Sequence, residues 1–93
     1  MGNQEKLNPG FEELFENESE EQRHLILHND EVNTFDFVID SLVEVCNHEF
    51  EQAEQCALIT HYNGKCDIKN GEFDKLRAMR RRLSEKGLSA TIE

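Results

Sequence analysis

The spacing of apolar residues predicts a short strand followed at once by an amphipathic helix. Along His24–His28, Ile26 faces one way and Leu25 and Leu27 face the other, so both faces of the strand should be partly covered. A turn is expected at residues 29–32. The helix is then indicated by apolar side chains that recur at i, i+3, i+4, i+7 and i+11, which are Phe35, Val38, Ile39, Leu42 and Cys46.

Two polar residues mark the start of this helix. Asn33 is the predicted N-cap, because its side-chain oxygen can accept a hydrogen bond from a backbone N–H of the first turn. Asp36 follows within that turn, where the helix dipole favours a negative charge. The helix should continue to about residue 47.

Two more helices and two more strands complete the pattern. A helix over residues 50–62 would turn inward Ala53, Ala57, Leu58 and Thr60 or His61, and Asn63-Gly64 would end it. A strand at 65–68 and a turn at 69–71 come next. A helix over residues 72–86 would turn inward Phe73, Leu76, Met79 and Leu83. With a last strand at 88–92, we predict an α+β fold: a small α/β sandwich in the order β-α-α-β-α-β, with three helices packed on a three-stranded sheet.

The chain divides by charge into an N-terminal extension and a core. Residues 1–21 contain seven glutamates against a single lysine and few apolar side chains. Such a segment cannot offset its own ordering entropy, so we predict a flexible acidic extension over residues 1–22 and a folded core over residues 23–93. We refer to residues 1–22 as the acidic segment.

Overall composition excludes several classes of function. The chain has 20 acidic against 10 basic side chains, a net charge of −10, which argues against nonspecific nucleic-acid binding. No apolar run reaches the roughly 20 residues of a membrane span, so no membrane is expected. Three cysteines without a CxxC motif favour small buried hydrophobes in a reducing cytoplasm over disulfides. We expect a monomer.

Metal, cofactor and catalytic sites are not expected. The closest histidines, His24 and His28, would lie about 13 Å apart on a strand, too far to share a metal ion. No nucleophile elbow or phosphate-binding loop occurs, so we predict no enzyme activity and no cofactor. The arginines at positions 80–82 could be a solvated helix face, or a surface for an acidic partner or for the acidic segment itself.

Three polar residues remain as candidate chemistry. Asn29 and Asp30 end the first predicted strand, and His61 lies near the end of the second predicted helix, so all three could meet at one rim. Their oxygen and nitrogen acceptors would suit an ammonium group. The alternative is that Asn29 and Asp30 form only a turn and that His61 only interacts with the helix dipole.

The residues that resemble a known family lie in three stretches and at the C-terminus. They are Leu25-Ile-Leu-His-Asn-Asp-Glu31, Phe35-Asp-Phe-Val-Ile-Asp-Ser-Leu42, Ala57-Leu-Ile-Thr-His-Tyr-Asn-Gly-Lys65 and Leu88-Ser-Ala-Thr-Ile-Glu93. Their order and content resemble the ClpS family, the bacterial adaptors that deliver N-degron substrates to the Clp protease. The resemblance covers roughly residues 23–93.

The resemblance implies both a site and a function. It implies that the free α-amino group of a substrate is held by Asn29, Asp30 and His61. It implies an apolar pocket for the substrate's first side chain, lined by Phe35, Val38, Ala57, Thr60 and Leu88, with Asn33 near the rim. The chain would then be a non-enzymatic adaptor whose partners are N-degron substrates and a Clp-type AAA+ unfoldase (ClpA or ClpC) with ClpP. The alternative is a regulatory module that binds the unfoldase without reading N-degrons.

Overall fold

The computed structural model describes residues 21–93, and the first twenty residues lie outside the described residues. Its elements are β1 (Arg23–His28), α1 (Phe35–Cys46), α2 (Phe50–Asn63), β2 (Lys65–Gly71), α3 (Phe73–Glu85) and β3 (Ser89–Ile92). The predicted order β-α-α-β-α-β is therefore confirmed. The predicted extension over residues 1–22 falls almost entirely outside the described part and stays a prediction.

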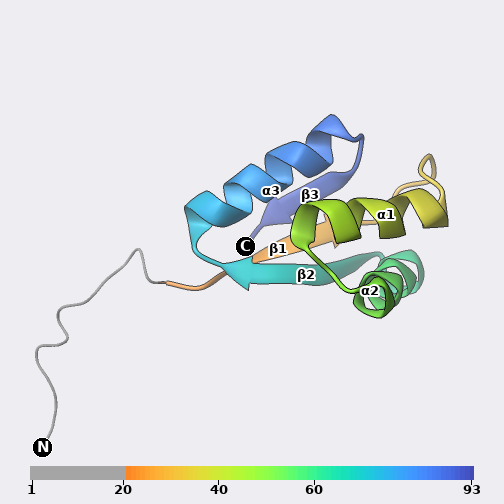
Figure 1. The fold of residues 1–93 in the computed structure, drawn as a ribbon, viewed down its shortest axis with the longest axis horizontal. Coiled ribbons are helices and arrows are strands. Elements are labelled where there is room, and N and C mark those ends of the chain that lie inside the picture. Colours follow the sequence, from red (N-terminus) through yellow and green to blue (C-terminus); the bar gives the residue numbers. More distant parts are fainter. Residues whose placement is uncertain (1–20) are drawn as a thin grey trace, which may run out of the picture.

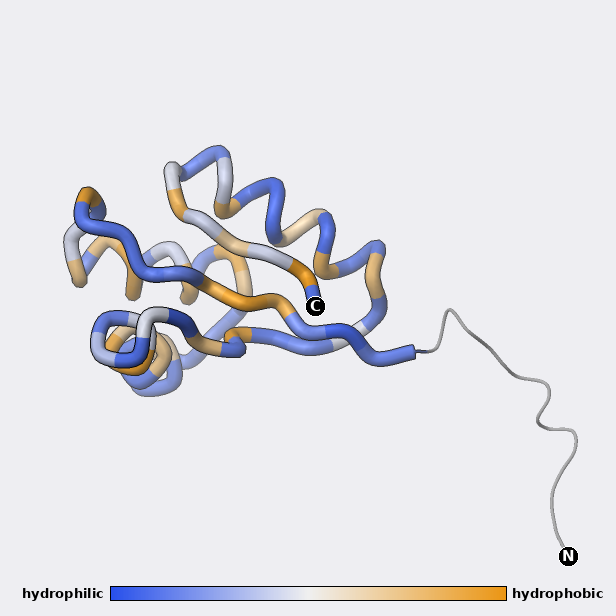
Figure 2. The backbone as a smooth tube through the Cα atoms, turned by 180° about the vertical axis from the view of Figure 1, so that it is seen from behind, coloured by the Kyte–Doolittle hydropathy of each residue, from blue (hydrophilic) through white to orange (hydrophobic). Residues whose placement is uncertain are grey.

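The three strands form one antiparallel sheet with β1 in the centre, in the order β2-β1-β3. In Figure 1, α1 and α3 lie in front of the sheet, and α2 packs against α1 and β2. Seen from behind in Figure 2, the strands lie in front of these helices, and the centre of β1 is hydrophobic. The two ends of the folded part meet, because His24 and Glu93 exchange a pair of backbone hydrogen bonds of 2.8 Å each.

The core forms where the helices cover the sheet. Leu25 and Leu27 of β1 are almost fully buried and pack with residues from every other element, among them Leu42, Leu76 and Leu83. Ile26 points to the opposite face, as the alternation predicted. Burying each large side chain of this kind contributes about 1.5–3 kcal/mol, so the five leucines carry much of the stability of this small domain.

The predicted cap of α1 was wrong by one residue. Thr34 is the N-cap, and its hydroxyl oxygen accepts a hydrogen bond of 3.1 Å from the N–H of Phe37. Asn33 lies in the preceding loop because its backbone and side-chain N–H groups both donate to Asp30. Both residue types can cap a helix, and this tertiary contact decides between them.

The predicted turn at residues 69–71 was also wrong. Lys69, Asn70 and Gly71 continue β2 and pair with Leu25, His24 and Arg23, respectively. Pairing with the central strand therefore overrides the local preference of Asn-Gly for a turn. Between Leu25 and Ile26 the pairing skips Ile68, so a bulge in β2 shifts the register by one residue.

The predicted inner faces of the helices are confirmed in their centres and fail near the helix ends. In α2, Ala53, Ala57 and Thr60 are buried, whereas Leu58 and His61 are exposed. Cys56 takes the place expected of Leu58. At the first positions of α1 and α3, Phe35 and Phe73 are about 40% exposed, because a helix end extends beyond the sheet that covers its middle.

The three cysteines are free and buried, as predicted. Burial raises the pKa of the Cys46 thiol to about 11 and that of the Cys56 thiol to about 12, and it also raises the pKa of Cys66. Within residues 21–93, no cluster of three His, Cys, Asp or Glu side chains could hold a metal ion. None of the helices in this part is both long and apolar enough to span a membrane.

Candidate functional site

A pocket opens where β1 ends beside the last turn of α2. The N–H of Asn29 donates to the carbonyl of Gly64 at 2.9 Å, and the N–H of Gly64 in turn caps α2 by donating to Thr60 at 2.9 Å. Gly64 has φ of +94°, a conformation that residues with a side chain rarely adopt. This pair of bonds brings Asn29 next to the helix turn that carries His61, as the sequence suggested.

The carboxylate of Asp30 is held in one orientation by its own loop. Its Oδ1 accepts hydrogen bonds from the N–H groups of Val32 at 2.9 Å and Asn33 at 2.8 Å, and its Oδ2 accepts one from the Asn33 side chain at 3.1 Å. Led by the Asn33 backbone bond, these contacts hold the pKa of Asp30 below its ordinary value, against a smaller opposing effect of burial. Asp30 is therefore an oriented anion. Since a carboxylate has about four acceptor positions, one on Oδ2 stays open.

Asn33 connects this loop to a segment that is distant in the sequence. Besides the bond to Asp30, its amide nitrogen donates to the carbonyl of Gly87 at 3.0 Å. Gly87 belongs to the turn between α3 and β3. The loop that carries Asp30 is thus supported by a residue more than fifty positions away in the sequence.

The floor of the pocket is apolar. Val38 is half-buried, and Ala57 and Thr60 are buried. The hydroxyl of Thr60 donates to the carbonyl of Cys56 at 2.7 Å, so its hydrogen atom is already used within α2. The pocket measures about 490 Å³, which lies within the range of sites for small ligands. We refer to it as the β1–α2 pocket.

Eight of the nine predicted site residues line the β1–α2 pocket. They are Asn29, Asp30, Asn33, Phe35, Val38, Ala57, Thr60 and His61. The ninth, Leu88, is not among the lining residues: it is buried in the core and reaches the surface on the side of α3.

Three lining residues were not predicted. Glu31, Leu58 and Tyr62 complete the rim, and each is the sequence neighbour of a residue that was predicted. Tyr62 is 77% exposed, and the rings of Tyr62 and His61 meet edge to face with 4.9 Å between their centroids. The exposure of Leu58 and Tyr62 could not be predicted from spacing, because both residue types would also suit the buried face of a helix.

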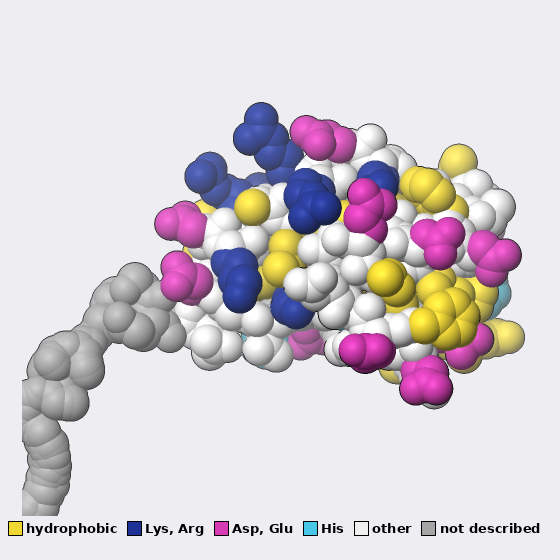
Figure 3. Space-filling view, in the orientation of Figure 1, with side chains coloured by type: hydrophobic (Ala, Val, Ile, Leu, Met, Phe, Trp, Pro, Cys, Tyr) yellow, Lys and Arg dark blue, Asp and Glu magenta, His cyan; other side chains and the backbone are white. Residues whose placement is uncertain are grey.

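The surface divides into an apolar end and a basic end. Figure 3 shows hydrophobic side chains gathered over α1 and α2, and Lys and Arg side chains gathered over α3. The apolar end includes the exposed side chains of Phe35, Leu58 and Tyr62, which line the pocket, and that of Val32, which lies in the loop beside the lining residues Glu31 and Asn33. Exposed apolar groups that surround a hollow are typical of a binding site.

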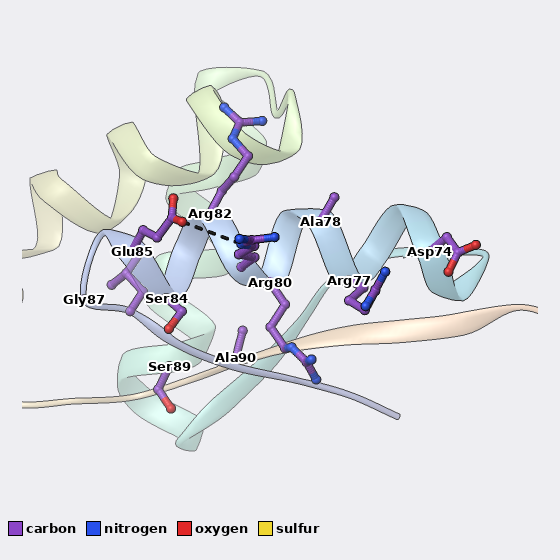
Figure 4. A pocket seen from close by; sticks show the side chains of 12 residues that line it. Asp74, Arg77, Ala78, Arg80, Arg82, Ser84, Glu85, Gly87, Ser89 and Ala90 are labelled. Atoms are coloured by element: carbon purple, nitrogen blue, oxygen red, sulfur yellow. Dashed lines mark ion pairs between the residues drawn. The ribbon is translucent and has the colours of Figure 1, made fainter.

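A larger groove of about 1140 Å³ runs between α3 and β3. Figure 4 shows that α3 contributes arginines to it, whereas β3 contributes only the small residues Ser89 and Ala90. The groove is lined mostly by charged and small side chains, whereas the smaller pocket combines Val38 and Ala57 with convergent polar groups, and we therefore assign the candidate site to the smaller pocket. We refer to the larger hollow as the α3–β3 groove.

Comparison with known proteins defines the class of this chain. The family model described as ATP-dependent Clp protease adaptor protein ClpS matches residues 18–91. The chain belongs to the ClpS family, which is a family of protease adaptors. This confirms the resemblance drawn from the sequence motifs.

Individual relatives agree with this assignment. Proteins from Campylobacter jejuni subsp. jejuni and subsp. doylei, both described as ATP-dependent Clp protease adapter protein ClpS, are 45% identical to the chain over 51 residues. The match covers 53% of the chain and 53% of each relative, about half the length of both. A solved structure of Agrobacterium tumefaciens ClpS2 bound to L-phenylalaninamide is similar with a TM-score of 0.74 and 19% identity, over 77% of this chain and 94% of that one. This likeness confirms the predicted fold.

Proposed function

We propose that the chain is an adaptor that binds the N-terminus of substrate proteins in the β1–α2 pocket. It selects a free α-amino group and a bulky hydrophobic first residue. It delivers the bound substrate to a Clp-type AAA+ unfoldase, ClpA or ClpC, for degradation by ClpP. The protein acts without chemistry of its own and without a cofactor.

One observation carries this proposal: an oriented carboxylate stands at the rim of a pocket whose floor is apolar. Asp30 has an open acceptor position beside Asn29 and His61, while Val38 and Ala57 lie below. A peptide N-terminus presents the matching pair of groups, an ammonium and a side chain on the same carbon atom. L-phenylalaninamide, the ligand of the similar ClpS2 structure, has the same pair.

The energies explain why both groups are needed. Burying a leucine or phenylalanine side chain contributes about 1.5–3 kcal/mol, and a hydrogen bond to a charged group contributes about 1.5–3 kcal/mol. Each alone gives weak binding, and together they give an affinity useful for an adaptor. An acetylated N-terminus would leave the carboxylate of Asp30 desolvated and without its partner, so blocked peptides should be strongly rejected.

The test is fluorescence-polarisation binding of peptides that begin with Phe, Leu, Trp, Tyr or Ala, each with a free or an acetylated N-terminus. We expect binding of the bulky free-amine peptides only. The variant Asp30→Asn keeps an oxygen for the two backbone N–H groups but removes the charge, and it should weaken binding about 10- to 100-fold.

The matched control for this variant is Asp40→Asn. It makes the same change at an exposed position of α1 outside the pocket lining and should change the affinity little. Equal binding of free and acetylated peptides would contradict the proposal. If none of the peptides binds and the chain still binds an unfoldase, the regulatory module without N-degron recognition is the correct function.

A further inference from the structure

The α3–β3 groove has positive charges that the described residues do not neutralise. Arg77, Arg80 and Arg81 line it together with Asp74 and Glu85. Arg81 is engaged by Glu85, with 3.7 Å between Nε and Oε2. Within residues 21–93, neither Arg77 nor Arg80 forms an ion pair. In Figure 4, Arg80 extends from α3 toward β3.

The other wall of the groove is the edge of the sheet. β3 pairs only with β1, so one of its edges has no strand beside it in the described part of the chain. Residues opposite each other in an antiparallel pair are hydrogen-bonded at every second position, and the pair His24 and Glu93 is such a position. The N–H and C=O groups of Ala90 and Ile92 therefore point away from β1. A basic helix face beside open peptide groups is suited to an extended acidic peptide that adds to the sheet.

The sequence of this chain contains a segment of that composition. Residues 11–20 hold five glutamates and no lysine or arginine. The groove arginines and these glutamates are complementary in charge. Because the segment belongs to the same chain, its effective concentration at the groove can reach the millimolar range, so a weak contact suffices.

The attachment point of the segment lies at the correct end of the groove. The guanidinium of Arg23 lies 5.6 Å from the centre of the Phe73 ring, and His24 is hydrogen-bonded to Glu93. The chain thus enters β1 beside the first residue of α3 and the end of β3. Ten extended residues reach about 33 Å, whereas the thirteen residues of α3 span about 20 Å. The segment is therefore long enough to follow the whole groove.

We propose that residues 11–20 lie in the α3–β3 groove of their own chain. Their glutamates interact with Arg77 and Arg80, and their peptide groups meet the free edge of β3 at Ala90 and Ile92. The acidic segment thereby covers a basic surface of the core and is released by salt or by an acidic competitor. This inference does not depend on N-degron binding.

The test is paramagnetic relaxation by a spin label in the full chain, attached to the thiol introduced by Ser19→Cys. The native thiols are buried and their pKa values are raised, so the introduced thiol reacts selectively. We expect the label to broaden the amide signals of Ala90, Ile92 and residues 77–81. The broadening should be lost at about 1 M salt, where the screening length is about 3 Å.

Two charge-reversal variants distinguish an effect of the groove arginines from an effect of the overall net charge. Arg77→Glu/Arg80→Glu should abolish the broadening. Lys65→Glu/Lys75→Glu changes the net charge equally at exposed positions outside the groove and should preserve it. Broadening that is absent in the parent chain, spread evenly over the surface, or unchanged in the arginine variant would overturn the proposal.

A mixed sample identifies the chain to which the bound segment belongs. Chains enriched in nitrogen-15 but without the spin label are mixed with spin-labelled chains of natural isotope abundance. We expect no broadening in the mixture, since the contact is within one chain. Broadening in the mixture would assign the groove to the segment of a second copy and overturn the proposal. Excess synthetic peptide of residues 11–20 should displace the segment and remove the broadening from the fully labelled sample.

Discussion

The β1–α2 pocket and the α3–β3 groove are both hollows beside the same sheet, but the side chains that line them differ in polarity and in the sign of their charge. The pocket has an apolar floor and a carboxylate whose three hydrogen bonds fix its position. The groove has exposed arginines on long side chains and an open strand edge. The pocket can distinguish one small group from another. The groove can attract acidic segments in general without selecting a particular residue.

Under the two proposals, one small domain holds two ligands and distinguishes them by the charge and polarity of the two hollows. Asp30 and Glu31 should repel an acidic segment from the pocket, and the groove offers a hydrophobic side chain mostly charged and small neighbours. Selectivity comes here from repulsion as much as from attraction. Four measurements test this difference between the pocket and the groove.

The largest effect is expected from filling the pocket. In Ala57→Phe the new ring would take the space of the substrate's first side chain, and peptide affinity should fall about 10- to 100-fold, because the burial of that side chain is lost. Ala78→Phe adds the same ring at an exposed position of the α3–β3 groove and should leave peptide affinity unchanged. Fluorescence polarisation measures both. A similar loss in the two variants would show that the hollows are not independent.

Salt should have a more moderate effect, and it should weaken binding in the groove more than binding in the pocket. Raising the ionic strength from about 0.1 M to about 1 M shortens the screening length from about 10 Å to about 3 Å. Docking of the acidic segment in the groove should weaken about tenfold or more, whereas peptide affinity for the pocket should change only a few-fold, because much of it comes from apolar burial. The spin-label experiment and polarisation titrations report the two values. An equal salt dependence of docking and of peptide affinity would contradict the assignment of the first to charge and of the second to apolar burial.

Removing the cap of α1 should affect stability more than binding. Thr34→Ala deletes the hydroxyl that accepts from Phe37 and should lower the free energy of unfolding by about 1 kcal/mol. For a domain of this size, that lowers Tm by about 4–8 °C. Urea titration and thermal melts measure the change, and Thr34→Ser, which keeps the hydroxyl, is the control. If Asn33 rather than Thr34 capped the helix, Thr34→Ala would have no such effect.

The smallest effect is a pH dependence that arises from Asp30. Since folding lowers the pKa of this carboxyl below its usual 3.8, Asp30 stabilises the fold above that value, and the contribution is lost as the pH falls through the lowered pKa. Asp30→Asn should remove this part of the acid dependence of the urea midpoint. Because the carboxyl is partly exposed, the change should be small. An identical pH profile in parent and variant would contradict the lowered pKa.

The element order could be predicted because apolar spacing alone fixes which segments can bury a stripe against a sheet. The alternation in β1 identified its buried face correctly, and the period of 3.6 in α1 identified Ile39, Leu42 and Cys46 but also included the exposed Phe35. What failed depended on contacts between distant segments. Thr34 replaced Asn33 as the cap because Asp30 had already engaged Asn33, and β2 continued through Asn70 because β1 offered it a partner.

The candidate site was predictable to a similar degree. Asn29, Asp30 and His61 could each be placed at the end of an element, and the bond from Asn29 to Gly64 brings them to one rim. Their role in holding an amino group stays a prediction. The second donor contact of Asn33, to Gly87, and the position of Leu88 outside the pocket could not be foreseen, since both depend on how the turn after α3 packs.

The three buried cysteines provide a way to follow this protein without any label. A thiol with a pKa of about 11 is almost entirely protonated at neutral pH, and only the thiolate reacts with alkylating reagents. Alkylation therefore requires the core to open, and its rate reports the free energy of that opening. Cys46, Cys56 and Cys66 lie on α1, α2 and β2, so equal rates would mean that these elements open together. A peptide that binds only the folded chain would then slow all three reactions by the same factor, set by its concentration relative to its dissociation constant.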